Sequence, residues 1–450
     1  MKKLLLTLGG VILSLTSGAQ SVTIEDFTYN FYTSGNAYVE KYNGTATEVT
    51  IPATITVDGA SKNVTGIGSS AFEGNTTIQK IHLGRNNSYT LGKAAFKGCS
   101  ALKVLNWAST SGATGNVTTD RFYYPTTSIP ESAFEGCSAI DGYIYNRYTN
   151  KVSVGKNAFK DCSNATGIYL YSTSIGDNAF EGCSKMQRIY LYSNESIGDN
   201  IIKGCSILAY IFFLGNTVPV VSENALVGIP NTAKIDIAFQ YISDDYIDAF
   251  GDYKGKVFGY VDFNSTVGYV RVLSTKKSLS LNTANYTLYY VSSVEETPTD
   301  INVVLTQTPS KVLPKNTALV VKYGGTSASV FMNATVQTTD PTVPYVNYLW
   351  PVLEDTEVTP ESGINYYQAK TAMAKDATEY FSKVTATSSL NIGSGYLKVV
   401  DGSAVTGIKE VKPVKIIGLD NDDIYTLSGV RVTNPTKGIY IRGGKKYVVK

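Results

Sequence analysis

The chain has 450 residues, five cysteines, one histidine and a formal net charge of +2. This length allows two or three domains, and the balanced charge leaves no electrostatic footprint for nucleic-acid binding outside a basic C-terminal tail. With a single histidine and neither a GxSxG nor a GxxxxGK motif, the sequence does not support Ser-His or Cys-His catalysis or a phosphate-binding loop. We therefore expect no enzyme, no cofactor and no metal.

Residues 1–19 have the pattern of a secretory signal peptide. Met1-Lys2-Lys3 is followed by an apolar run from Leu4 to Leu15 and then by Ser17-Gly18-Ala19, which predicts cleavage after Ala19. We expect a secreted or cell-surface protein that lies outside the outer membrane. No later segment approaches the roughly 18 apolar residues that a spanning helix needs, so we expect no transmembrane helix.

Between residues 64 and 237 the chain repeats one short sequence. Ala-Phe-Lys-Gly-Cys-Ser at Ala95 returns as Ala-Phe-Glu-Gly-Cys-Ser at Ala133 and again at Ala179. Recurrence at about 20–40 residues predicts a solenoid, in which each unit buries its apolar residues against the next. Seven units can be followed through the second residue of the conserved pair: Phe72, Phe96, Phe134, Phe159, Phe180, Ile202 and Leu226.

Each unit combines a turn with a strand. In Ile189-Tyr190-Leu191 the alternation predicts a strand with Tyr190 on the opposite face from its neighbours. The segment from Asn178 to Gly182 predicts one helical turn, with Asn178 as its N-cap and Gly182 at its end. One step between units is longer than the others, and we expect the stretch from Ser109 to Thr127 to be looped out of the stack there.

The repeat resembles a known family. Ile-Gly-x-x-Ala-Phe-x-Gly-Cys-x-x-Leu-x-x-Ile-x-Leu is similar to the BspA-like leucine-rich repeat of bacterial surface and secreted proteins, here of the Bacteroidetes type. The resemblance implies a leucine-rich-repeat solenoid, mainly β with short helical turns, and attachment to host matrix proteins, other bacteria or host cells. Residues 20–63 resemble the N-terminal β cap of such arrays. Residues 238–261 resemble the C-terminal cap, with an amphipathic helix from Ser243 to Phe250.

The second half of the chain has a different pattern. Short Val/Thr/Tyr-rich runs separated by turn residues predict a β-sandwich-like module over residues 262–405. Residues 406–450 carry Ile424-Tyr425-Thr426-Leu427-Ser428-Gly429 and a basic end, and they resemble the C-terminal sorting domain of the type IX secretion system. That resemblance implies contact with the secretion machinery, whereas a small closing β-sheet is the alternative.

Several polar or reactive residues are expected to be structural. All five cysteines occupy the same slot of the repeat, which favours buried, reduced side chains over stacked disulfides or a metal site. Asp177 and Asp199 fall in equivalent slots about 5 Å apart, where we expect solvated turn residues rather than a cation site. His82 is expected to be a solvated surface residue. A second group of acidic residues is expected to lie in a solvated loop: Glu354, Asp355, Glu357 and Glu361.

The outward positions of three successive strands are rich in aromatic residues. Strand spacing places Tyr169, Tyr190 and Phe212 side by side, with Tyr171 and Tyr192 in a second row. Tyrosine and arginine dominate binding hot spots, so the candidate ligand-binding face is Tyr169, Tyr171, Arg188, Tyr190, Tyr192, Tyr210 and Phe212. The sequence favours an adhesin-like protein that binds an extracellular protein or glycan. Two alternatives are a purely structural surface component and a carbohydrate-capturing component acting through the second β module.

Overall fold

The computed structural model describes residues 11–13, 21–84, 89–107, 122–124, 128–146, 151–192, 195–264, 270–281, 285–296, 301–324, 329–341, 347–370, 373, 381–392, 394–400, 424–426, 431–432, 438–442 and 445–449. The chain divides into two compact units, Met1–Tyr260 and Val261–Lys450. Each unit is described by itself.

The first unit begins with a mostly antiparallel sheet. Its strands are β1 (Val11–Leu13), β2 (Val22–Ile24), β3 (Phe27–Phe31), β4 (Ala37–Tyr42), β6 (Thr54–Val57), β7 (Ala60–Ile67) and β9 (Thr90–Leu91). They lie in the order β1-β2-β3-β4-β7-β6, and β9 pairs in parallel with β7. Apart from β1, the expected signal peptide lies outside the described residues.

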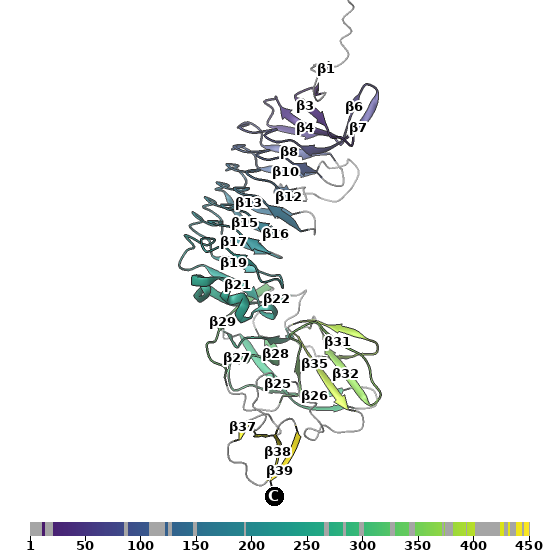
Figure 1. Ribbon diagram of the computed structural model, residues 1–450, viewed down its shortest axis with the longest axis vertical. Coiled ribbons are helices and arrows are strands. Elements are labelled where there is room, and N and C mark those ends of the chain that lie inside the picture. The colour runs from purple at the N-terminus through teal and green to yellow at the C-terminus, as the bar shows by residue number, and fades with distance from the viewer. Residues whose placement is uncertain are drawn as a thin grey trace, which may run out of the picture. The chain divides into compact units, whose positions relative to one another are not determined.

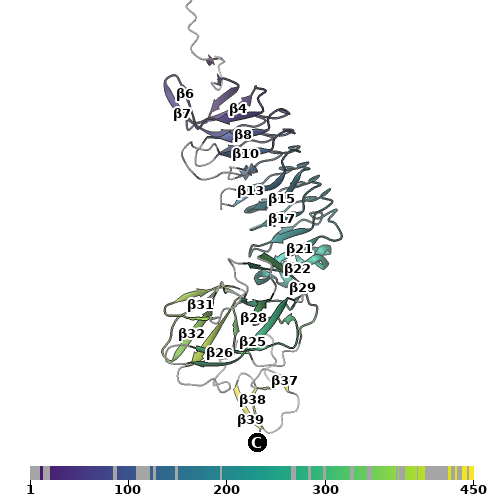
Figure 2. The ribbon, with the colours of Figure 1, turned by 180° about the vertical axis from the view of Figure 1, so that it is seen from behind.

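The repeats coil into a solenoid whose strands run parallel to one another (Figures 1 and 2). One row of strands starts with β5 (Glu48–Ile51), β8 (Lys80–Leu83) and β10 (Val104–Trp107). It continues with β11 (Phe122–Tyr124), β13 (Gly142–Asn146), β15 (Ala165–Leu170), β17 (Arg188–Leu191), β19 (Tyr210–Phe213), β21 (Lys234–Ala238) and the first half of β22 (Val257–Asn264). A second row contains β12 (Ser128–Ile129), β14 (Val152–Val154), β16 (Ser172–Ile175), β18 (Ser196–Ile197) and β20 (Val220–Val221).

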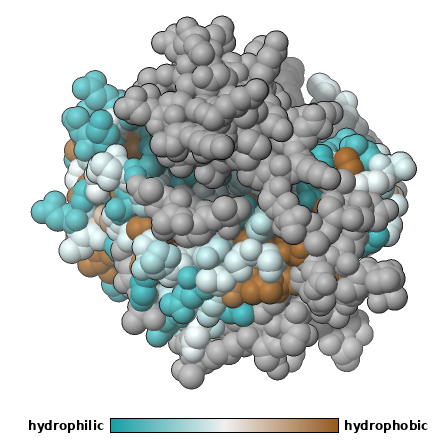
Figure 3. Space-filling model, turned by 90° about the horizontal axis from the view of Figure 1, so that it is seen from below, coloured by the Kyte–Doolittle hydropathy of each residue, from teal (hydrophilic) through white to brown (hydrophobic). Residues whose placement is uncertain are grey.

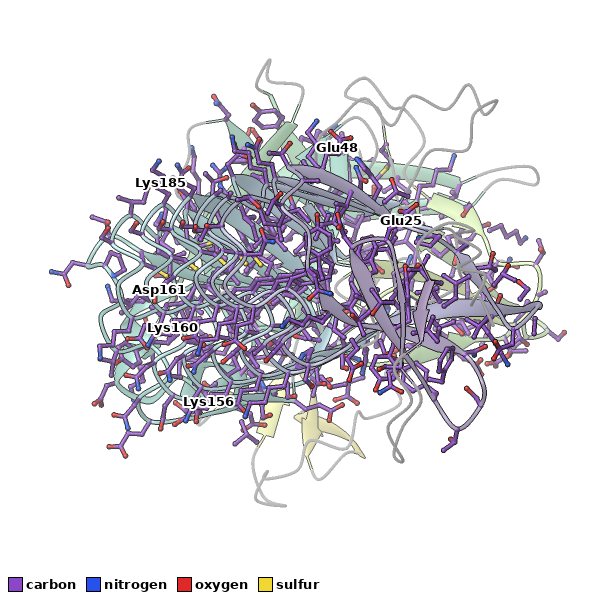
Figure 4. The ribbon with its side chains drawn as sticks, turned by 90° about the horizontal axis from the view of Figure 1, so that it is seen from above. Glu25, Glu48, Lys156, Lys160, Asp161 and Lys185 are labelled. Atoms are coloured by element: carbon purple, nitrogen blue, oxygen red, sulfur yellow. The ribbon has the colours of Figure 1, made fainter. Side chains whose placement is uncertain are left out.

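The third side of each coil is a turn that bonds to the next coil. The backbone N–H of Phe96 donates to the carbonyl of Ala133 at 2.9 Å, and that of Phe134 donates to the carbonyl of Ala158 at 2.8 Å. These turns carry the residues labelled on the outside of the coils in Figure 4, which include Lys156, Lys160 and Asp161. The solenoid is therefore hydrogen-bonded from coil to coil along all three sides.

Stacked rings fill the inside of the turns. The Phe96 and Phe134 rings lie 5.3 Å apart at 6°, and the Phe134 and Phe159 rings lie 5.3 Å apart at 10°. All the phenylalanines of this slot are buried, and Tyr42 of the N-terminal sheet stacks on Phe72 at 5.3 Å. The predicted fold class, a mainly β leucine-rich-repeat solenoid with short helical elements, is confirmed.

Charged side chains alternate along the outside of the turns. The residue after each Ala-Phe or Ile-Ile pair is, in chain order, Glu73, Lys97, Glu135, Lys160, Glu181 and Lys203. Lys97 pairs with Glu135 at 3.3 Å, and Glu181 pairs with Lys160 at 3.0 Å and with Lys203 at 3.8 Å. Each cation thus lies against an anion of an adjacent coil.

Two local predictions were wrong. Asn178 is not an N-cap, because it has a left-handed φ of 57° and its segment is a hydrogen-bonded turn rather than a helix. The stretch from Ser109 to Thr127 is not wholly looped out either, since Phe122–Tyr124 forms β11 and pairs in parallel with β13. The rest of that stretch lies outside the described residues.

A short helix follows the last repeats. The sequence predicts an amphipathic helix there, and α1 spans Asp244–Asp248 with the Ser243 side chain accepting a hydrogen bond from the Tyr246 N–H. It lies between the 3-10 helices η1 (Phe239–Tyr241) and η2 (Gly251–Lys256). Tyr246 and Phe250 are buried and pack on Phe213 of the last repeat strands.

The second unit has two antiparallel sheets that share a core. One contains β23 (Val270–Thr275), β28 (Thr317–Tyr323), β25 (Tyr286–Glu296) and β26 (Ile301–Gln307), and the other contains β30 (Trp350–Pro351), β35 (Gly395–Val400), β32 (Ile364–Ala369) and β33 (Phe381–Lys383). Buried residues of both sheets, including Val320 and Leu397, belong to one apolar cluster. On the face shown in Figure 3, hydrophobic residues form small separate areas among hydrophilic ones.

The remaining strands of this unit are shorter or more peripheral. They are β24 (Leu279–Leu281), β27 (Val312–Leu313), β29 (Ser329–Val336), and the pair β31 (Thr356–Val358) with β34 (Ser388–Leu390). The tail contributes an antiparallel sheet of β36 (Ile424–Thr426), β37 (Arg431–Val432), β38 (Gly438–Arg442) and β39 (Lys445–Val449), in the order β37-β36-β38-β39. Residues 401–423, which include the start of the sorting-like tail, lie outside the described residues.

Candidate functional site, an aromatic ladder on the repeats

The outward aromatic residues of the repeat strands stack on one another. Parallel pairing of β15, β17 and β19 puts Tyr169, Tyr190 and Phe212 in register. The Tyr169 and Tyr190 rings lie 4.3 Å apart at 5°, and the Tyr190 and Phe212 rings lie 4.5 Å apart at 9°. Tyr171 and Tyr192 form the second row, 4.3 Å apart at 7°. We call these five residues, together with Tyr145, the aromatic ladder.

The ladder is longer than the sequence predicts. Tyr145 on β13 stacks on Tyr169 at 5.3 Å and 10°, and Tyr143 lies 5.5 Å from Tyr169 at 37°. The alternation of Tyr143-Ile144-Tyr145 was available as a signal, because it places both tyrosines on the outward face of a strand. At the other end, the Tyr260 ring meets Phe212 edge-on at 5.0 Å.

The rings of the ladder differ in exposure. Tyr171 is the most open of the expected site residues, at 36% exposed, whereas Tyr169, Tyr190 and Tyr192 are half-buried. The expectation that Phe212 faces solvent was wrong, since only 1% of it is exposed. Tyr190 covers one face of the Phe212 ring, and the Tyr260 ring, which comes from beyond the repeats, meets Phe212 edge-on.

Arg188 and Tyr210 lie in a row beside the ladder. The parallel register aligns Tyr143, Gly167, Arg188, Tyr210 and Lys234 across five strands. Arg188 Nη1 donates a hydrogen bond to the Tyr143 hydroxyl at 3.3 Å. This bond spans the strand of Gly167, and it raises the pKa of the Arg188 guanidinium. The Tyr210 ring stacks on Phe212 at 5.5 Å.

Burial favours the protonated form of three phenols of the ladder. It raises the pKa of Tyr192 to about 12, and it also raises the pKa of Tyr169 and Tyr190 above the ordinary value for tyrosine. Neighbouring tyrosines act in the same direction on Tyr190, because ionising one phenol would place its charge against the next. The hydroxyl groups of Tyr169, Tyr190 and Tyr192 are therefore neutral at physiological pH.

The stacking decides which chemistry the surface offers. Tyr190 lies nearly parallel to Tyr169 at 4.3 Å and to Phe212 at 4.5 Å, so both of its faces are covered and it presents its edge and hydroxyl outward. Ring edges carry the positive part of the aromatic quadrupole and hydroxyls both donate and accept hydrogen bonds. Such a surface suits the carbonyls and side chains of a protein better than a sugar ring, which stacks on an open aromatic face.

His82 does not behave as an isolated surface residue, contrary to expectation. Its Nδ1 lies 2.6 Å from Asn106 Oδ1 and its Nε2 lies 2.9 Å from Glu48 Oε1. The partners come from the strands on either side, β10 and β5. The imidazole therefore cross-links three neighbouring coils, which is a structural role.

The five cysteines form a reduced ladder inside the solenoid, as the repeat slot predicts. All are buried and free, and each thiol donates to the carbonyl of the phenylalanine in the preceding unit; Cys162 and Cys183, for example, donate to Phe134 and Phe159 at 3.2 and 3.1 Å. Burial raises the pKa of Cys99 and Cys205 to about 12. Protonated, sequestered thiols are poor nucleophiles and metal ligands.

The acidic residues are engaged in local hydrogen bonds. The backbone N–H of Asp199 donates to Asp177 Oδ1 at 3.0 Å, and the Ser222 hydroxyl donates to Asp199 Oδ1. In the second unit, the carboxylates of Glu357 and Glu361 accept from hydroxyls of Ser389 and Tyr366. Within the described ranges, no group of three or more His, Cys, Asp or Glu residues is arranged to hold a metal ion.

The repeats match a known family model. Residues 47–124 and 113–232 match the family model of the BspA type leucine rich repeat region, in six copies where we distinguish seven units. The repeats of this chain are thus similar to that family over residues 47–232. No curated protein matches the chain. Among the helices of the described residues, none has the length and apolar character needed to cross a membrane.

Solved structures with similarity to the chain include other leucine-rich repeat proteins. One from Bacteroides ovatus is 22% identical with a TM-score of 0.33, over 50% of this chain and 59% of that one. A leucine rich cell surface protein from Faecalibacterium prausnitzii is 19% identical with a TM-score of 0.34, over 46% and 58%. The leucine rich repeat protein of T. pallidum is 20% identical with a TM-score of 0.36, over 46% and 97%. The chain thus spans less than two thirds of the first two.

Proposed function

We propose that this chain is a secreted or cell-surface binding protein whose aromatic ladder binds an extracellular protein. The observation that carries the proposal is the ladder itself, which continues in register over four strands and has the exposed Tyr171 in its second row. Stacked tyrosines are already rigid, so they contact a partner at little further cost in side-chain entropy. The proposal assigns no catalytic step to the chain.

Two properties of the ladder favour a protein over a glycan as its partner. Both faces of the central Tyr190 ring are covered by Tyr169 and Phe212, so it offers its edge and hydroxyl to a partner. Arg188 lies beside the ladder on the same strand as Tyr190, and arginine with tyrosine is the combination most enriched in protein hot spots. BspA-type repeats are moreover associated with surface attachment.

The test replaces the ladder hydroxyls without removing the rings. In Tyr171→Phe/Tyr192→Phe the stacked pair keeps its shape, so the free energy of unfolding should change by no more than about 0.5 kcal/mol. Binding to immobilised matrix proteins, such as fibronectin, fibrinogen, laminin and collagen, should fall at least about tenfold because the hydroxyls provide the polar contacts. Surface plasmon resonance on the full chain measures this directly.

A matched control distinguishes the purely structural alternative. Tyr286→Phe removes a hydroxyl from a buried tyrosine of the second unit, outside the ladder, and should leave binding unchanged. If the ladder only stabilises the sheet, the Tyr171→Phe/Tyr192→Phe variant will bind the panel as the parent does. The proposed binding function of the ladder is also rejected if the parent chain binds none of the panel proteins.

We further propose that the tail, residues 406–450, directs the chain to the cell surface. The support is the resemblance of Ile424–Val432 and Gly438–Ile441 to type IX sorting domains, in a segment whose described parts are short antiparallel strands. Deleting residues 420–450 and fractionating the cells tests this proposal. Retention of the protein inside the outer membrane supports it, and unchanged surface location rules it out.

A further inference from the structure

The second unit carries an aromatic surface that is built differently from the ladder. Antiparallel pairing aligns Trp350 on β30, Tyr396 on β35, Gln368 on β32 and Ser382 on β33 in one row across the sheet. Residues directly opposite each other in a sheet share a face. Their chain neighbours Leu397, Tyr367 and Phe381 point the other way, into the shared core. The row therefore lies on the opposite face of the sheet, where Tyr396 packs against a second apolar cluster that includes Tyr366 and Leu390.

The Trp350 ring at one end of this row is open. Trp350 is 40% exposed, and Tyr396 is half-buried. Their ring centroids are 6.2 Å apart at 28°. If the ring planes are about 3.5 Å apart, which is van der Waals contact, two rings with this centroid distance are displaced sideways by about 5 Å. That displacement is roughly one ring width, so neither ring covers the face of the other. In the ladder the corresponding spacing is 4.3 Å, and the faces are covered.

Hydrogen-bonding groups continue the row. Gln368 and Ser382 are both half-buried, and each lies one strand further along the row from Tyr396. An amide and a hydroxyl both donate and accept. With strands about 4.8 Å apart, the row extends about 14 Å from Trp350 to Ser382. It therefore joins an apolar platform to a neutral polar strip.

Charge around the row favours a neutral ligand. None of the four side chains carries a formal charge. The diagonal neighbour Lys398 has its ammonium 5.5 Å from the centroid of the Tyr366 ring, and Tyr366 in turn donates its hydroxyl to Glu361. These charges are thus engaged beside the row and not in it.

We propose that Trp350, Tyr396, Gln368 and Ser382 form a binding site for a neutral oligosaccharide. A pyranose ring has an apolar face of C–H groups and a rim of hydroxyls. One such face packs on the open indole of Trp350, beside the edge of the half-buried Tyr396, while hydroxyls along the chain bond to the Gln368 amide and the Ser382 hydroxyl. This site is independent of the protein-binding ladder, because it lies in the other unit and uses open ring faces.

The experiment titrates the full chain with soluble hexasaccharides of β-linked glucose, mannose and xylose by calorimetry, and with a heparin hexasaccharide as the anionic comparison. At least one neutral probe should bind and heparin should not. Trp350→Ala should weaken that binding at least about tenfold and Gln368→Ala at least about threefold. In a Trp107→Phe background, where Trp350 is the remaining tryptophan, the same probe should shift the emission.

Two controls make the outcome decisive. Tyr171→Ala in the ladder should leave oligosaccharide binding unchanged, which separates this site from the proposed protein-binding function. Trp350→Phe keeps a smaller ring and should retain part of the affinity, with a thermal unfolding midpoint equal to that of the parent. The proposal is overturned if none of the neutral probes binds, if heparin binds more tightly than they do, or if Trp350→Ala binds as the parent does.

Discussion

The Tyr143 hydroxyl accepts a hydrogen bond from Arg188 Nη1 at 3.3 Å, although the two residues are 45 positions apart and belong to strands that do not pair with each other. Gly167, on the strand between them, makes this contact possible because it has no side chain on the outward face. A Cβ at position 167 would lie 2.2 Å from the Tyr143 ring. The glycine is thus part of the candidate site.

Replacing that glycine should disturb the site and the fold together. Gly167→Ala forces the Tyr143 ring to move, which should lower the free energy of unfolding by about 1–3 kcal/mol and break the bond to Arg188. Urea denaturation checks this. Gly255→Ala is the matched control, since a Cβ there meets no atom within 4 Å; equal losses in the two variants would contradict the steric argument.

Removing a ring from the inner phenylalanine stack should be costly but local. Phe180 is fully buried, with its ring 6.0 Å from that of Phe159, so Phe180→Ala should lower the free energy of unfolding by about 3–5 kcal/mol. Because each unit is supported mainly by its neighbours, hydrogen exchange should accelerate most around Cys162, Phe180 and Cys205. Uniform acceleration across the repeats would instead show a single cooperative unit.

The buried thiols should make the protein less stable in alkali. Burial raises the pKa of Cys99 and Cys205 to about 12 and that of the three inner cysteines well above the ordinary 9.0. Above the ordinary pKa the unfolded chain loses these protons while the folded chain keeps them. The free energy of unfolding is therefore at its full value below about pH 9 and falls as the pH rises toward 12. Each thiol lowers it by up to about 1.4 kcal/mol per pH unit.

Denaturation midpoints at about pH 8 and about pH 10.5 measure this loss, which tyrosine ionisation reinforces in the same direction. Cys183→Ala isolates the contribution of one thiol and should reduce the difference between the two midpoints. A variant with the same pH dependence as the parent would show that Cys183 ionises equally in both states. Titration of the denatured chain with a thiol reagent should find five free thiols.

The aspartates between coils should act as hydrogen-bond acceptors rather than as cation ligands. Asp177 Oδ1 accepts the backbone N–H of Asp199 at 3.0 Å, so Asp177→Ala should lower the free energy of unfolding by about 1 kcal/mol. Asp177→Asn keeps an acceptor oxygen and should lose less. Calcium at millimolar concentration should leave the melting temperature of the parent unchanged, and a calcium-dependent rise lost in both variants would show a cation site.

The repeat period was enough to predict which residues share a row. It aligned Tyr169, Tyr190 and Phe212 correctly, because parallel coils with a constant turn bring equivalent positions into register. It also placed the cysteines and phenylalanines inside, since no unit of this size can bury them alone. The fold of the repeats therefore followed from periodicity.

The repeat period does not predict contacts with residues that lie outside the repeats. Phe212 is buried by Tyr260, which follows the last repeat, and His82 is bonded to Glu48 from the lead-in strand. Asn178 adopts a left-handed φ that an N-cap does not have, because its turn must bond to the next coil. Each of these depends on tertiary neighbours that a local motif does not encode.

The alternation of Glu135, Lys160 and Glu181 along the turns has a consequence for how such arrays change length. Deleting the coil that contains Lys160 would bring Glu135 against Glu181, whereas deleting two successive coils would restore an attractive pair. Each exposed pair contributes only about 0.2–1 kcal/mol. The interaction nevertheless changes from attraction to repulsion whenever an odd number of coils is gained or lost. Gain or loss of coils during evolution should therefore be easiest in even numbers.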